Sequence, residues 1–145
     1  KDEGSEWSNA VMVSVLMREG RMKEAREAAE KMTTNPTWMR ELLQACLNKE
    51  PKEAVDLLAE QARDRLLSEQ DSELKYYQGA VLAQCGEKKI AYAFLGKAVE
   101  EKYCAYQALQ ADPLLAGVQG ESEFREIVQS AGECQKKFME GSGMR

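Results

Sequence analysis

The chain has 145 residues, 43% of them hydrophobic and 31% charged, with a formal net charge of −5, and this length fits one domain of the usual ~100–150 residues. The acidic balance without basic clusters argues against a nucleic-acid-binding surface and against contact with an anionic membrane. No signal peptide is recognised, and no apolar run approaches the ~20 residues that a transmembrane helix needs.

A first helical hairpin is predicted over residues 5–34, with its two helices separated at Gly20. Apolar residues recur at three- and four-residue steps, as they do on one face of a helix. They are Val11, Met12, Val15 and Leu16 in the first helix and Met22, Ala25, Ala29 and Met32 in the second. Residues 1–4 are expected to form a flexible end. Because the chain begins with Lys1, we expect it to be either processed or a piece cut from a longer protein.

A second hairpin is predicted over residues 35–68. Asn35–Pro36 is a helix-start signal, because Asn can cap free backbone amides and Pro suits the first helical position. Glu50–Pro51 then opens the next helix. The apolar positions are Trp38, Leu42, Ala45 and Cys46, followed by Ala54, Leu57, Leu58, Ala62 and Leu66.

A third hairpin is predicted over residues 71–102, with a turn at Gly86, a residue type that tolerates the left-handed conformation of a helix end. Small residues stand where its two helices would cross, at Gly79, Ala91 and Ala98. Because the side chains at the contact set the distance between packed helices, this pattern predicts a close approach.

The remaining residues, 103–140, are predicted to form a capping region that covers the open end of the stack. Asp112–Pro113 ends a short helix. The acidic run that begins at Glu121 then suits the positive end of a last helix. That helix carries Phe124, Ile127, Val128 and Ala131 on one face and continues toward Phe138. Residues 141–145 are expected to be a second flexible end.

The third hairpin resembles a tetratricopeptide repeat (TPR), a 34-residue helix–turn–helix with the pattern W-x2-L-G-x2-Y…A-x3-F…P. Gly79 matches the central glycine, Leu82 stands at the tyrosine position, and Ala91-x3-Leu95 matches the A-x3-F step. Lys75 and Gln78 depart from the tryptophan and leucine positions, and no proline closes the unit.

The alanine of the A-x3-F step recurs in all three hairpins. Ala25, Ala54 and Ala91 are separated by 29 and 37 residues, and the mean of these two spacings, 33, is close to the family period. A lone hairpin cannot bury its apolar stripe, so repeated hairpins stack on one another. The resemblance therefore implies an all-α superhelix, a TPR solenoid of three hairpins plus capping helices, forming a single domain over residues 5–140.

The ending of the chain resembles the close of C-terminal TPR regions in some bacterial multidomain signalling proteins. The resemblance lies in the Tyr103–Tyr106 segment, in Asp112-Pro113-Leu114-Leu115 and in Glu123-Phe124. In those proteins the repeats follow a serine/threonine kinase or a winged-helix regulator domain.

The four cysteines, at positions 46, 85, 104 and 134, include no close pair of the kind that metal sites prefer. We interpret them as reduced thiols that act as small buried hydrophobes. This interpretation predicts a reducing compartment and therefore a cytoplasmic protein.

The sequence predicts neither catalysis nor a metal or cofactor. Histidine, the commonest general base and metal ligand, is absent. Neither of the glycine-rich phosphate-binding patterns occurs. Glutamates such as Glu24, Glu27 and Glu30 stand at exposed helical spacing, which is typical of a solvated face.

Protein binding is the predicted function. In the family, the first helix of each repeat lines a concave groove that binds a peptide or helix of a partner. The corresponding candidates here are Trp7, Met17, Met39, Leu43, Tyr76, Tyr77 and Ala80. Such an apolar and aromatic stripe suits an amphipathic helix or an extended peptide. The alternative is that several of these residues pack between neighbouring helices or under the terminal helix. The alternatives are self-association as a homodimer and a regulatory region of a bacterial signalling enzyme.

Overall fold

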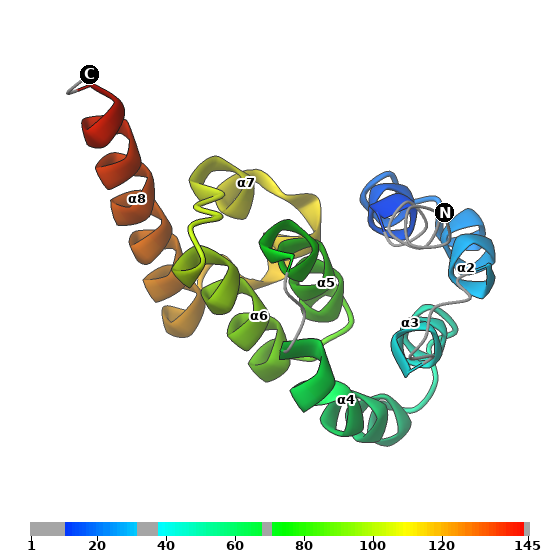
Figure 1. Cartoon of the computed structure of the whole chain (residues 1–145). Helices are drawn as coiled ribbons and strands as arrows, with labels where there is room; N and C mark the ends of the chain where they lie inside the picture. The colour runs from blue at the N-terminus through cyan, green and yellow to red at the C-terminus, as the bar shows by residue number, and fades with distance from the viewer. Residues whose placement is uncertain (1–10, 32–37, 68–70, 144–145) are drawn as a thin grey trace.

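The computed structural model describes residues 11–31, 38–67 and 71–143 (Figure 1). Within these ranges every regular element is a helix and there is no strand, which confirms the all-α prediction for this part of the chain. Its helices also include none that is both long and apolar enough to cross a membrane.

Successive helices are separated by only a few residues. After the helical residues 11–18 come α2 (Met22–Glu30), α3 (Trp38–Leu47), α4 (Lys52–Leu67), α5 (Ser72–Gln84), α6 (Lys88–Glu100), α7 (Tyr106–Ala111), the 3₁₀ helix η1 (Pro113–Val118) and α8 (Ser122–Gly143). Contacts join α2 to α3, α3 to α4, α4 to α6, α5 to α6 and α6 to α8, so packing largely follows chain order. In Figure 1, α2, α3, α4 and α6 lie along an arc, and α5 lies on its inner side.

The same turn ends a helix at four places. After residues 11–18, the N–H of Gly20 donates to the carbonyl of Met17 and that of Arg21 to the carbonyl of Leu16, which is the paired hydrogen-bond pattern of a Schellman motif. The pattern recurs at residues 49–50, 86–87 and 102–103. The first residue of each pair has a positive φ, of 77° at Gly20, 57° at Lys49, 89° at Gly86 and 79° at Lys102. The predicted turns at Gly20 and Gly86 are therefore confirmed.

The close approach predicted at Gly79 is present between α5 and α6. A Cβ atom at this position would lie 3.0 Å from the Leu95 side chain and 3.1 Å from the Cβ of Phe94. Ala91 and Ala98 on the facing helix are fully buried or nearly so. The missing side chain of Gly79 thus sets the distance between the two helices.

We expect Gly79→Ala to lower the free energy of unfolding by about 1–2 kcal/mol, because the strain of overpacking, about 1–3 kcal/mol, exceeds the helix-propensity gain of up to about 1 kcal/mol. Gly96→Ala in α6 is the matched control, since its Cβ would meet no atom within 4 Å; that variant should be about 0.5–1 kcal/mol more stable than the wild type. Urea unfolding measures both. Equal effects of the two substitutions would contradict the close contact.

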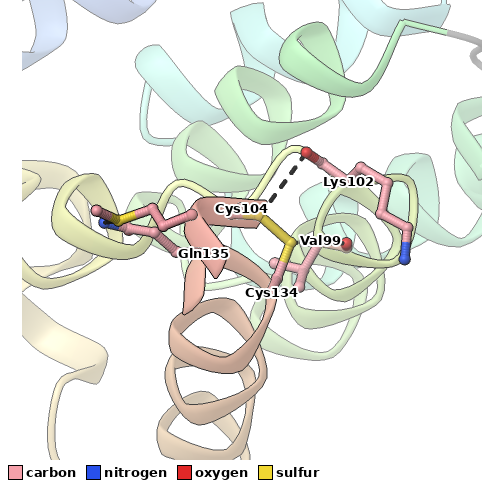
Figure 2. The surroundings of a disulfide bond; sticks show 6 residues. Val99, Lys102, Cys104, Cys134 and Gln135 are labelled. Carbon is pink, nitrogen blue, oxygen red and sulfur yellow. Dashed lines mark hydrogen bonds between the residues drawn. A yellow bond between two sulfur atoms is a disulfide. The ribbon is translucent and has the colours of Figure 1, made fainter. Parts of the chain in front are cut away.

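Two disulfides join segments that are distant in sequence. Cys46 of α3 is bonded to Cys85 at the end of α5, and Cys104 is bonded to Cys134 of α8 (Figure 2), with Cα–Cα distances of 5.6 Å in both pairs. The prediction of reduced thiols is therefore wrong. The paired cysteines lie 39 and 30 residues apart, and helix packing brings them together, so sequence spacing gave no signal.

The last helix is longer than the sequence indicates. Residues 141–143, which were expected in a flexible end, belong to α8. The other predicted flexible residues, 1–4 and 144–145, lie outside the described ranges.

Candidate functional site

The predicted groove residues are mostly buried. Trp7 and the side chain of Met39 lie outside the described part of the chain. Four others are at most 6% exposed: Met17, Leu43, Tyr76 and Ala80. Of the five whose side chains are described, Tyr77 alone is half-buried. The four buried side chains belong to the hydrophobic core, as the alternative interpretation of these positions expects.

The segment after α6 provides part of this burial. The 3₁₀ helix η1 packs against α5, with Leu114 and Leu115 in the core. The hydroxyl of Tyr76 donates a hydrogen bond of 2.7 Å to Asp112, the residue that precedes η1. The capping region thus covers a face of α5 on which two of the predicted groove residues, Tyr76 and Ala80, lie.

Asp112 connects this segment to the first hairpin. Arg18 binds its carboxylate with two donors, and the Nε–Oδ1 distance is 2.8 Å. Asp112 also caps η1 by accepting a hydrogen bond of 3.0 Å from the N–H of Leu114. A further Arg18 nitrogen donates to Ser14 Oγ at 2.7 Å. The end of the first helix and the start of η1 therefore meet although 94 residues separate them.

The electrostatics of this cluster keep Asp112 ionised. Burial alone would raise the pKa of its carboxyl group, but hydrogen bonds from Arg18, Tyr76 and the Leu114 N–H hold that pKa below its ordinary value. Burial and the neighbouring Asp112 carboxylate raise the pKa of Tyr76. Near neutral pH, Tyr76 is therefore a neutral donor and Asp112 a charged acceptor.

Tyr77 lies beside this cluster and reaches the surface. The Arg18 guanidinium carbon is 5.9 Å from the centre of the Tyr77 ring, within the range of a cation–π contact. The Tyr77 hydroxyl donates to Glu73 at 2.9 Å. Burial and the Glu73 carboxylate raise the pKa of Tyr77 to about 12. Arg18, Glu73 and Tyr77, all half-buried, form what we call the inner-face patch.

Sequence reasoning missed the role of Lys75, which stands at the position of the family tryptophan. Its side chain is 1% exposed, and its Nζ contacts the two carboxylate oxygens of Glu101 at 2.7 and 2.9 Å. Hydrogen bonding from Lys75 lowers the pKa of Glu101. A lysine on an otherwise apolar helix face was the available signal for a buried ion pair between α5 and the end of α6.

Within residues 11–31, 38–67 and 71–143, no group of three or more His, Cys, Asp or Glu side chains could hold a metal ion. No family model, curated protein or solved structure matches the chain. The resemblance to TPR proteins therefore stays a prediction, and the described part of the chain defines an all-α protein of packed helices.

Proposed function

We propose that this chain is a protein–protein interaction module of the TPR type, which binds a peptide or helical segment of a partner or of its own parent protein. Two observations support the TPR assignment. The same helix-ending turn recurs in all three hairpins. The glycine-mediated contact in the third hairpin also occurs where the family pattern has its glycine.

The contact between Arg18 and Tyr77 carries the proposal. It joins the first helix of the first hairpin to the first helix of the third, over a separation of 59 positions. The first helices of both hairpins therefore meet at this contact, which supports a shared face of the kind that the family's first helices form. The inner-face patch lies where these two helices meet, and it contains Tyr77, which among the groove residues with described side chains is the one that is not buried.

The patch has the composition of a binding hot spot. Tyr and Arg are enriched among the residues that dominate protein interfaces, and here they lie against each other beside the carboxylate of Glu73. The ring offers apolar area and the flanking charges offer hydrogen bonds, which suits a short peptide or one helix face. The proposal assigns no reaction and no cofactor to the chain.

The test is selection of peptides from a random displayed library against the wild-type chain, followed by affinity measurements on variants. We expect Tyr77→Ala to weaken binding of the selected peptides about tenfold or more. Leu57→Ala is the control, because Leu57 on α4 is also a large apolar side chain and is 59% exposed. Peptides whose affinity is unchanged by Tyr77→Ala would contradict binding at the patch.

The two disulfides also change the proposed compartment. The cytoplasmic prediction depended on reduced thiols, and because the cysteines are paired in disulfides it no longer has this support. Structural disulfides form and persist in oxidising compartments and are rare in the cytosol. We therefore propose that the module works in an oxidising environment, such as a periplasm or the cell exterior.

A further inference from the structure

The C-terminal turns of α8 extend past the elements on which the helix packs. α8 has 22 residues and α6 has 13. The two helices run parallel, since Lys88 pairs with Glu121 at one end and the Cys134 sulfur lies 4.0 Å from the Val99 carbonyl oxygen at the other. Figure 1 shows the last turns of α8 projecting away from the other helices.

The projecting turns carry exposed apolar side chains. Phe138 is 73% exposed and Met139 is 60% exposed. Phe138 follows Cys134 by one helical turn, on the face that holds the fully buried Phe124 and Ala131 nearer the start of the helix. The apolar face of α8 thus continues past the helices that bury its first part.

A groove of about 610 Å³ runs beside this stripe, between α6 and α8. Its lining includes small or apolar residues, among them Ala93, Gly96, Ile127 and Ser130. It also includes charged residues: Lys89, Glu100, Lys102, Glu123, Glu126, Glu133 and Lys137. Small residues allow the close approach of another helix, and the charged ones can pair with charges on it.

The charges on α8 favour a second copy of the same helix. Glu123, Ser130 and Lys137 all line the groove and are spaced seven residues apart, so they share one face. If an identical helix lies antiparallel, with the two-fold axis at Ser130, Lys137 of each copy comes opposite Glu123 of the other. Ser130 at the centre is small enough for the helices to approach closely.

We propose that this chain forms a two-fold symmetric dimer in which α8 of each copy lies antiparallel in the α6–α8 groove of the other. Each Phe138 then packs against the second copy near the start of its α8. The arrangement is isologous, because the same surface serves on both chains. It uses none of the three residues of the inner-face patch, so dimerisation and peptide binding can fail separately.

The dimer is expected to be weak. One helix pair with its flanking helices covers less than the ~800 Å² per partner of a standard interface. The pairing also brings Glu133 of one copy near Glu126 of the other. Lys102, which lines the same end of the groove, partly offsets this repulsion.

Sedimentation equilibrium of the full chain over micromolar to millimolar concentrations tests the proposal. We expect a reversible dimer, with Phe138→Ala and Lys137→Glu each raising its dissociation constant about tenfold or more. Lys136→Glu is the matched control, since it changes the net charge equally but lies outside the groove lining; it should have a much smaller effect.

Mixing two weakened variants gives the sharpest test. Glu123→Lys and Lys137→Glu each place like charges opposite each other in their own dimers, but an equimolar mixture restores both opposite-charge pairs. We expect the mixture to dimerise at least about tenfold more tightly than either variant alone. A chain that is monomeric at all concentrations overturns the proposal, and so does a dimer whose affinity responds equally to Lys136→Glu and Lys137→Glu.

Discussion

Replacement of Asp112 by alanine is expected to lower the free energy of unfolding by about 3–5 kcal/mol, the loss typical of removing one partner from a buried ion pair. The Asp112 side chain is 4% exposed and that of Arg18 is 20% exposed. Without the carboxylate, the Arg18 guanidinium and the Tyr76 hydroxyl lose a shared acceptor, and η1 loses its cap. Urea unfolding followed by circular dichroism measures the loss.

Glu24→Ala provides the control for Asp112. Glu24 pairs with Arg21, but both side chains are about half exposed, and exposed pairs contribute about 0–1 kcal/mol. The pH dependence gives a second measurement. In the folded state the pKa of Asp112 lies below the ordinary 3.8. The contribution of its carboxylate to the free energy of unfolding is therefore complete above pH 3.8, and it is lost as the pH falls through the lower, folded-state pKa. Equal losses for Asp112→Ala and Glu24→Ala would contradict the proposed network.

Removal of the Cys46–Cys85 disulfide by the double substitution C46A/C85A is expected to cost about 2–4 kcal/mol. The bond closes a loop of 39 residues between α3 and the end of α5, which restricts the unfolded chain more than the folded one. The measurement is the denaturant midpoint of the variant against the wild type, both without reductant.

A reductant supplies the control for the disulfide prediction. It should lower the midpoint of the wild type by more than that of the double variant, which retains only Cys104–Cys134. Thiol titration of the denatured wild type should find none of its four cysteines reactive before reduction and all four afterwards. Four reactive thiols before reduction, or a midpoint that the substitutions leave unchanged, would refute the cross-links.

Local signals in the sequence predicted the helices well, because each depends on a few neighbouring residues. Gly20 and Gly86 identified two turns, since glycine adopts a positive φ at little cost. Lys49 and Lys102 occupy the equivalent positions with φ of 57° and 79°. No glycine is present at those turns. There the hydrogen bonds of the helix ends stabilise a positive φ, which is less favourable for lysine than for glycine.

Contacts between distant segments could not be predicted in the same way. Arg18 and Asp112 each look like ordinary surface residues in the sequence, and the packing of the helices brings them together. The groove prediction was limited for the same reason, because it did not show that η1 would pack on α5 beside Tyr76. Tyr77, one position later on the helix, is only half-buried.

The Arg18–Asp112 pair has a consequence for how the chain comes apart. Repeat arrays interact mainly between nearest neighbours, so their terminal units fray independently of the rest. Here a charged bridge joins two residues 94 positions apart and links the helix of residues 11–18 directly to the start of η1. Fraying of that helix at Arg18 must break the bridge and loosen η1 at the same moment, which couples the two segments into one cooperative unit.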